Sequence, residues 1–262
     1  IDRDSLRRGF DTIHVQFAKD IKLSNSREAL HYGEGMANCV ADISYFLAIN
    51  NFSKINSSKS IQKMIELFSE ELSILGFAEM EDVHASTSVK GIDEKSVLRL
   101  YQQKTGRYTF ALPLLAGLIL QNKLTLTTRK VILRLAKNLG VVFQLRDDCL
   151  GVFGNFQKTG KSVGGDIREK KQTWLYFQLL KKATASDSRQ IKSWYSSGKV
   201  LTSSQVKQVL DYMGKYKLET TAELEIRKYQ KLAEKDIDKL PFKKQTKQKF
   251  LSLIEFLVTR EK

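Results

Sequence analysis

The chain has 262 residues, of which 42% are hydrophobic, and a formal net charge of +15 at neutral pH. This length and apolar content can form a sizeable core, which excludes a disordered polypeptide and a small disulfide-stabilised domain. The longest apolar run, 110–120, contains Pro113 and falls short of the roughly 18 residues of a membrane span. Cys39 and Cys149 are too few for a disulfide framework and lie in apolar helical patterns. We therefore expect buried, reduced thiols and a cytoplasmic protein.

The positive charge raises the question of a nucleic-acid partner, because clustered lysines and arginines neutralise phosphates. Much of the excess lies in two lysine-rich stretches, 199–217 and 227–249, where basic residues are spread among acids at helical spacing. That pattern is typical of a solvated helix face. We therefore expect no nucleic-acid partner.

Apolar residues recur at intervals of three and four along most of the chain, which predicts an all-α fold. Helices are expected at about 26–51, 60–85, 93–104, 125–151, 173–184, 203–217, 220–235 and 242–259. Asp93 is expected to cap the third of these helices, and Thr125 or Thr127 the fourth. Between them, the chain is expected to bend at Gly106 and Pro113 and to continue as a helix to residue 120.

The segment 143–154 places adjacent aspartates, Asp147 and Asp148, inside an apolar helical pattern, and Lys161 and Lys171 follow it. Buried carboxylates need a compensating cation. Hard oxygen ligands suit Mg²⁺, which keeps several waters and is completed by substrate phosphates. The sequence therefore predicts a site for a metal-chelated phosphate ester. Four positions share one face of this helix: Gln144, Asp147, Asp148 and Gly151.

These residues belong to a larger pattern, which resembles the trans-isoprenyl diphosphate synthases. This is the polyprenyl synthetase family, which includes farnesyl and geranylgeranyl diphosphate synthases. The resemblance runs from Ile1 to Lys262, with its motifs in the family's order. The motifs are the end of a first aspartate-rich motif with paired arginines (Asp2, Arg7, Arg8), Ala78 to Asp82, the Lys104-Thr105 step, the start of a second aspartate-rich motif (Gln144, Asp147, Asp148), and the later Lys161 and Lys171.

The resemblance implies a single all-helical domain over 1–262, an isoprenoid synthase type I bundle around a deep central cavity. It also implies a Mg²⁺-dependent prenyltransferase that condenses isopentenyl diphosphate head-to-tail with dimethylallyl, geranyl or farnesyl diphosphate. The product would be a short-chain polyprenyl diphosphate of farnesyl to geranylgeranyl length. A homodimer is expected, with the helices of Cys39 and of Glu79 and Asp82 near its interface.

The resemblance also implies a role for each matching residue. Mg²⁺ would be held by Asp2 and Asp147, with Asp148 binding through a metal-bound water. The catalytic residues would be Lys104, Thr105 and Gln144, the last two with oxygens facing the allylic cation. The substrate diphosphates would be bound by Arg7, Arg8, Lys104, Lys161 and Lys171.

Three departures from the family pattern stand in the sequence. Gly151 replaces the third aspartate of the second motif. Glu79 replaces a glutamine, a change to which the sequence assigns no effect. The first two aspartates of the first motif are absent, together with the helices that precede them in the family. We therefore expect the chain to be the C-terminal part of a longer one.

Two rival functions remain open. A non-catalytic partner subunit of a heteromeric synthase is favoured by the incomplete first motif and disfavoured by the intact later motifs. A terpene cyclase would carry an Asn, Ser and Glu metal triad in place of the stretch 158–171. Simpler roles compete as well: Lys104 could cap a helix before Gly106, and Asp42 and Asp82 are expected to bond neighbouring helices rather than a metal.

Overall fold

The structure is a computed structural model that describes residues 5–7, 9–21, 23–87, 92–154 and 163–260. These residues are overwhelmingly helical, which confirms the all-α fold. Contacts within the chain group into two compact units, Ile1–Glu66 and Leu67–Lys262. Among the described residues, no helix combines the length and apolar character needed to cross a membrane.

The first unit contains β1 (Leu6–Arg7), β2 (Phe10–Asp11), α1 (Ile13–Asp20), α2 (Ser26–Phe52) and the start of α3 (Ser58–Thr87). The two short strands pair antiparallel, with Arg7 opposite Phe10. Helices α1 and α2 pack closely because Gly33 has no side chain. A Cβ atom at Gly33 would lie 2.1 Å from the carbonyl oxygen of His14. The sequence predicted α2 and α3, but neither the hairpin nor α1.

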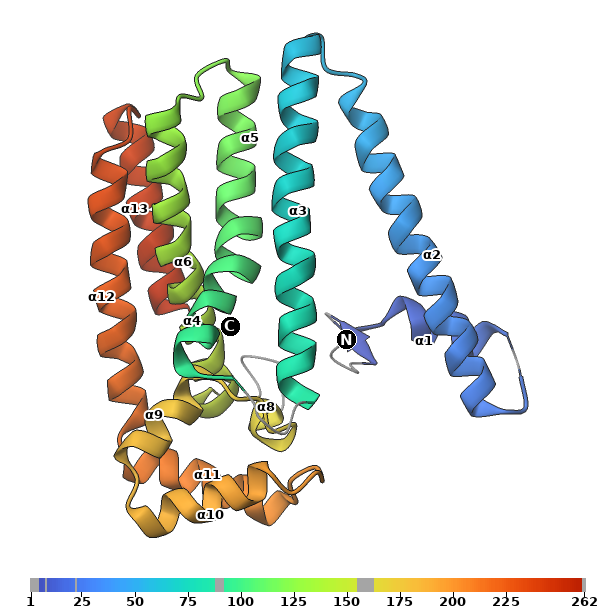
Figure 1. Ribbon diagram of the computed structural model, residues 1–262, viewed down its shortest axis with the longest axis vertical. Coiled ribbons are helices and arrows are strands. Elements are labelled where there is room, and N and C mark those ends of the chain that lie inside the picture. The colour runs from blue at the N-terminus through green and yellow to red at the C-terminus, as the bar shows by residue number, and fades with distance from the viewer. Residues whose placement is uncertain (1–4, 8, 22, 88–91, 155–162, 261–262) are drawn as a thin grey trace. The chain divides into compact units, whose positions relative to one another are not determined.

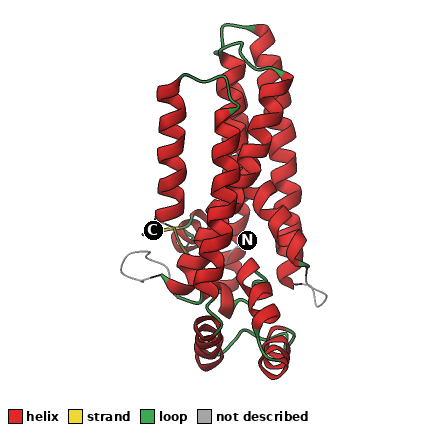
Figure 2. Ribbon diagram, turned by 90° about the vertical axis from the view of Figure 1, so that its left-hand side faces the viewer, coloured by secondary structure: helices red, strands yellow, loops and turns green. Residues whose placement is uncertain are grey.

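The second unit contains the rest of α3, α4 (Glu94–Leu100), η1 (Tyr101–Ala111), α5 (Leu112–Leu120), α6 (Leu126–Phe153), α8 (Gly165–Arg168), α9 (Trp174–Lys182), α10 (Ala185–Tyr195), α11 (Ser203–Lys215), α12 (Leu218–Asp238) and α13 (Lys244–Thr259). Helix α6 packs against η1, α12 and α13 (Figures 1 and 2). Helices α10 and α11 lie across one end of these long helices. The sequence missed α8 and α10, and its other helices are confirmed.

The predicted caps are present. The Thr125 side chain accepts a hydrogen bond from the Thr128 N–H at 3.1 Å and begins α6. The Asp93 carboxylate accepts one from the Ser96 N–H at 2.7 Å and begins α4. Each side chain satisfies a backbone donor that has no partner within its own helix.

The chain does not leave its helix after Lys104. Helices α4, η1 and α5 follow one another without a gap, and the middle segment is a π-helix. Pro113 lies at the start of α5, and its missing N–H removes one hydrogen bond from the continuous helix. Lys104 therefore does not cap a helix end, which removes the simpler alternative to a role at the site. Long π-helical stretches are rare, and π-turns often lie at functional sites.

Two glycines bring the backbones of η1 and α6 into direct contact. A Cβ atom at Gly106 would lie 2.7 Å from the Ala136 carbonyl oxygen. A Cβ atom at Gly140 would lie 2.5 Å from the Gly106 nitrogen. Both distances are shorter than a real Cβ contact, so no larger residue fits without moving a helix. This approach decides which side chains of the two helices can meet.

The two cysteines differ in burial. Cys149 on α6 is buried, as expected, and burial raises the pKa of its thiol to about 12. Cys39 on α2 is exposed, so the expectation of a buried thiol there is wrong. Cys39 shares this exposure with large apolar side chains of α2 such as Phe46 and Leu47, because an apolar helical pattern does not by itself bury every side chain that belongs to it.

Replacing Gly140 with alanine should lower the free energy of unfolding by about 1–3 kcal/mol, because the new methyl group overlaps the η1 backbone. Gly117→Ala is the matched control, since a Cβ atom there meets no atom within 4 Å. The control should be neutral or stabilising, by up to about 1 kcal/mol, because alanine favours helices. Urea unfolding followed by circular dichroism measures both changes. Equal stability of the two variants would contradict the close contact.

Candidate active site

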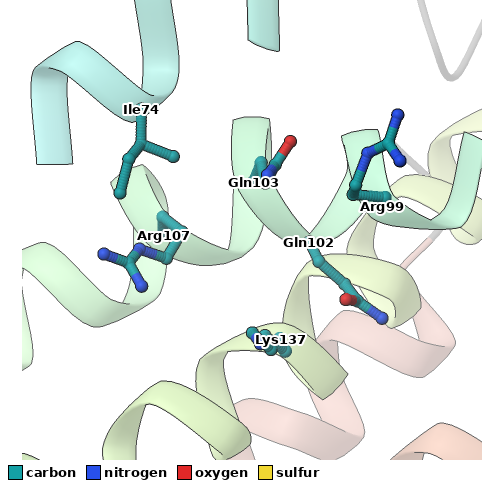
Figure 3. Close-up of a pocket in the computed structure, with 6 residues that line it drawn as sticks. All are labelled: Ile74, Arg99, Gln102, Gln103, Arg107 and Lys137. Carbon is teal, nitrogen blue, oxygen red and sulfur yellow. The ribbon is translucent and has the colours of Figure 1, made fainter. Parts of the chain in front are cut away.

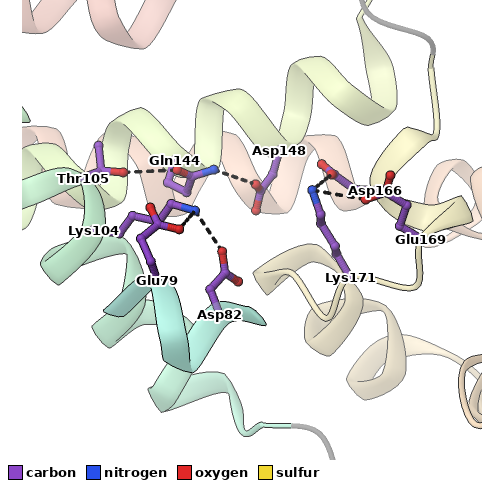
Figure 4. A network of polar contacts seen from close by, with 9 residues as sticks. All are labelled: Glu79, Asp82, Lys104, Thr105, Gln144, Asp148, Asp166, Glu169 and Lys171. Atoms are coloured by element: carbon purple, nitrogen blue, oxygen red, sulfur yellow. Dashed lines mark hydrogen bonds and ion pairs between the residues drawn. The ribbon is translucent and has the colours of Figure 1, made fainter. Parts of the chain in front are cut away.

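Polar side chains from α3, η1 and α6, and from the segment at and after α8, approach one another near the C-terminal end of α6 (Figure 4). Helix α3 supplies Glu79 and Asp82, and η1 supplies Lys104 and Thr105. Helix α6 supplies Gln144 and Asp148, and the segment at and after α8 supplies Asp166, Glu169 and Lys171. All these residues lie in the second unit. The motifs that are far apart in the sequence therefore converge here.

Lys104 lies between two carboxylates of α3. Its ammonium is 3.0 Å from Glu79 Oε2 and 2.9 Å from Asp82 Oδ2. Burial alone would lower the pKa of Lys104, but the hydrogen bonds and charges of Asp82 and Glu79 outweigh it and raise the pKa. Lys104 is therefore held as a cation. The expectation that Asp82 bonds a neighbouring helix is confirmed.

A chain of hydrogen bonds joins η1 to α6. Thr105 Oγ1 donates to Gln144 Oε1 at 3.2 Å, and Gln144 Nε2 donates to Asp148 Oδ1 at 3.4 Å. The Tyr101 hydroxyl donates to the other oxygen of Asp148 and accepts from the Trp174 backbone N–H at 3.1 Å. Both carboxylate oxygens of Asp148 thus have a donor. Sequence reasoning missed this role of Tyr101.

Asp148 is buried, with 4% of its surface exposed. Burial raises the pKa of its carboxyl well above the ordinary value, and the nearby charge of Asp166 adds to the effect. The hydrogen bonds from Tyr101 and Gln144 act in the opposite direction. In this arrangement Asp148 anchors η1 and α9 to α6. Its predicted contact with metal-bound water stays a prediction.

Asp147, the adjacent residue, faces a different environment. Its side chain is 32% exposed, and its Oδ1 lies 3.6 Å from Nη2 of Arg260. The Arg260 guanidinium lies over the Phe143 ring, 4.0 Å from its centroid, and donates to the Phe143 carbonyl oxygen at 3.2 Å. Burial lowers the pKa of Arg260, and the charge of Asp147 opposes this shift. The C-terminal end of α13 thus places a cation beside the predicted metal ligand, which the sequence did not suggest.

Lys171 is held by acids of its own segment. Its ammonium lies 3.0 Å from Asp166 Oδ1 and 3.4 Å from Glu169 Oε2. A Cβ atom at Gly151 would lie 3.5 Å from Asp166 Oδ2. The Asp166 carboxylate therefore lies next to the position at which the family pattern has a third aspartate.

The other predicted site residues are Arg7, Asp2, Arg8 and Lys161. Arg7 lies in the exposed hairpin of the first unit. Asp2, Arg8 and Lys161 lie outside the described residues. Their assignments stay predictions.

The carboxylates of the described residues fit a Mg²⁺ ion that is shared with substrate phosphates, but not a closed protein cage. Within 5–7, 9–21, 23–87, 92–154 and 163–260, no three His, Cys, Asp or Glu side chains form a group that could hold a metal. A closed protein cage is thus not built from these residues. Asp147 nevertheless offers a partly exposed carboxylate, and Mg²⁺ commonly uses one or two protein carboxylates with water and substrate phosphates. The donor set fits such a shared ion.

A pocket of about 380 Å³ lies between α3, α4, η1 and α6 (Figure 3). Its lining is Ile74, Arg99, Gln102, Gln103, Arg107 and Lys137. None of the predicted site residues lines it. The deep central cavity that the resemblance implies stays a prediction.

The family described as polyprenyl synthetase matches residues 1–213 of this chain. The chain is 26% identical over 266 residues to a geranylgeranyl diphosphate synthase of Saccharolobus solfataricus, which covers 100% of this chain and 74% of the relative. It is 28% identical over 182 residues to a short chain isoprenyl diphosphate synthase of Methanocaldococcus jannaschii, which covers 69% of this chain and 50% of the relative.

Solved structures agree on the fold. The structure is similar, with a TM-score of 0.83 and 23% identity, to a geranylgeranyl pyrophosphate synthase from Corynebacterium glutamicum complexed with isoprenyl diphosphate and magnesium. The match covers 99% of this chain and 73% of that one. The fold and the names of the relatives together therefore place the chain in the class of helical prenyltransferases. The chain belongs to the polyprenyl synthetase family.

Tyr101→Phe should lower the free energy of unfolding by about 1–3 kcal/mol, because Asp148 and the Trp174 N–H each lose a buried hydrogen-bond partner. Tyr108→Phe on the same helix is the control, since Tyr108 is 47% exposed. Its effect should stay within about 0.5 kcal/mol. Denaturant unfolding measures both. A loss no larger at Tyr101 than at Tyr108 would contradict the anchoring role of Asp148.

Proposed function

We propose that the protein is a Mg²⁺-dependent trans-prenyltransferase that condenses isopentenyl diphosphate head-to-tail with an allylic diphosphate to give a short-chain polyprenyl diphosphate. The observation that carries this proposal is the Thr105–Gln144 hydrogen bond beside Lys104, which unites two family motifs at one site. The names of the relatives from Saccharolobus solfataricus and Methanocaldococcus jannaschii support the same reaction class.

In the proposed reaction, the carbon–oxygen bond of the allylic diphosphate breaks and its electron pair leaves with the diphosphate. The double bond of isopentenyl diphosphate then forms the new carbon–carbon bond, and the released diphosphate accepts the proton that is lost, as the family resemblance implies. The ammonium groups of Lys104 and Lys171 would donate to the diphosphate oxygens, together with Lys161 and the arginines Arg7 and Arg8. Charges fixed in this way act where negative charge develops, which is usually the largest catalytic effect.

Mg²⁺, when bound, would neutralise diphosphate charge and so improve the leaving group. Asp147 would contribute a carboxylate, with Asp2 as the proposed second ligand. The oxygens of Gln144 and Thr105 would face the allylic cation. The hydrogen bond between them fixes their orientation, and Asp148 fixes the amide of Gln144 in turn. These residues therefore need little reorganisation when the cation forms.

A non-catalytic partner subunit is the alternative function. One observation supports it: each of the two described lysines of the site, Lys104 and Lys171, contacts two carboxylates. A subunit whose cations are neutralised internally would bind diphosphate weakly. Turnover by the protein without a second synthase decides between the two functions.

We also propose a cytoplasmic homodimer. Large apolar side chains of α2 and α3 are exposed, including Phe46 at 71%, Phe77 at 71% and Met80 at 68%. Exposed apolar surface of this kind commonly marks a protein interface. Sedimentation of the purified protein distinguishes a homodimer from a monomer that assembles only with a different subunit.

The purified protein, given Mg²⁺, labelled isopentenyl diphosphate and a series of allylic diphosphates, should form elongated products. Asp147→Asn should lower turnover by at least about a hundredfold, since the residue would lose the charge that holds Mg²⁺. Asp211→Asn on α11 is the control because Asp211 is exposed and remote in sequence from every motif. Its turnover should match that of the wild type. Turnover by Asp147→Asn at the wild-type rate would remove Asp147 from the metal site.

A further inference from the structure

Lys104 is the one cation in a group of three charges. Glu79 and Asp82 lie three residues apart on α3, so their carboxylates share one helix face. Both reach the same ammonium, at 3.0 Å and 2.9 Å (Figure 4). One positive and two negative charges therefore leave the group with a net negative charge. This sign is unfavourable for an anionic ligand at Lys104.

The two acids differ in their surroundings. The Glu79 side chain is 26% exposed and that of Asp82 is 44% exposed. Water screens the charge of the more buried Glu79 less. Glu79 also stands where the resembling family has a neutral glutamine. A glutamine oxygen at this position could still accept a hydrogen bond from Lys104, but without the negative charge.

The ammonium of Lys104 has three donor hydrogens; it donates one to Asp82 and forms an ion pair with Glu79. A diphosphate that binds Lys104 must share its donors with these acids or displace one of them. Glu79 and Asp82 are anions, as the diphosphate is, and both form ion pairs with Lys104 before the diphosphate arrives. The free energy of diphosphate binding is therefore reduced by the free energy of any ion pair that has to break. Removing one competing charge should therefore tighten binding without creating any new contact.

We propose that Glu79 competes with the allylic diphosphate for the ammonium of Lys104 and so weakens the affinity of the site for its substrate. Glu79 is a positioning residue in this role, because it acts through Lys104. The inference rests on the proposed prenyltransferase function. As a consequence of this competition, the enzyme would release diphosphates more readily. The change of Glu79 should act mainly on binding, since Lys104 would already contact the diphosphate before it ionises.

The test is Glu79→Gln, which keeps the shape of the side chain and removes its charge. The KM for the allylic diphosphate should fall about two- to fivefold, the range expected for a partly exposed ion pair. The kcat should stay within about twofold, as expected when ground state and transition state gain equally. The Kd of inorganic diphosphate with Mg²⁺, measured by calorimetry, should fall by the same factor as KM.

A double-mutant cycle with Lys104→Met makes the test specific. In the Lys104→Met background, Glu79→Gln should no longer tighten binding, because the ammonium for which Glu79 competes is gone. Glu81→Gln is the matched control: Glu81 lies on the same helix and pairs with Arg99 instead. It should leave KM and Kd unchanged. Glu79→Ala is the second variant, used if the glutamine variant fails to fold, and should also tighten binding.

Unchanged or weaker diphosphate binding in folded Glu79→Gln overturns the inference. If Glu79→Gln still tightens diphosphate binding in the Lys104→Met background, the inference is overturned too, since the charge of Glu79 would then act on the whole site rather than through Lys104. Failure of the proposed function looks different. A wild-type protein that binds inorganic diphosphate but forms no product overturns the catalytic activity, while the calorimetric comparison still decides the role of Glu79.

Discussion

The contact between the backbones of η1 and α6 is the constraint on which the site depends. Gly106 and Gly140 let the two helices approach more closely than any Cβ atom would permit. At that spacing the Thr105 hydroxyl reaches Gln144, and Tyr101 reaches Asp148. A wider spacing would leave these buried polar groups without partners, which is unfavourable in a dry interior. The two glycines thus permit the close contact, and the hydrogen bonds between the two helices stabilise it.

Opposite charges are already matched across the site. Lys104 contacts acids of α3, Lys171 contacts acids of its own segment, and Asp147 faces Arg260. This matching stabilises side chains that would otherwise repel one another in the absence of substrate. It also means that a diphosphate and its metal would exchange partners with existing ion pairs rather than fill a uniformly positive cavity. The affinity of such a site is a difference between two sets of charge interactions.

The sequence predicted the features that depend on local patterns. The long helices follow from apolar spacing, and the caps at Asp93 and Thr125 follow from local side-chain chemistry. Lys104, Thr105 and Gln144 could be placed together only through the family resemblance. Features that depend on packing were missed. The π-helical form of η1 arises where it crosses α6, and Arg260 reaches Phe143 across 117 residues of sequence, so neither leaves a local signal.

The adjacent aspartates show how one short motif acquires two roles. Successive residues of a helix point about 100° apart, so a helix at the edge of a core buries one and exposes the other. Asp148 turns toward η1, where Tyr101 donates to one of its oxygens, and Gln144 on its own helix donates to the other. Asp147 turns toward the end of α13 and remains partly exposed. Only the second can exchange its partner for an arriving cation without breaking the core. For the proposed metal site, the register of α6 against η1, set by the glycine contact, therefore leaves Asp147 as the aspartate that a metal could contact directly.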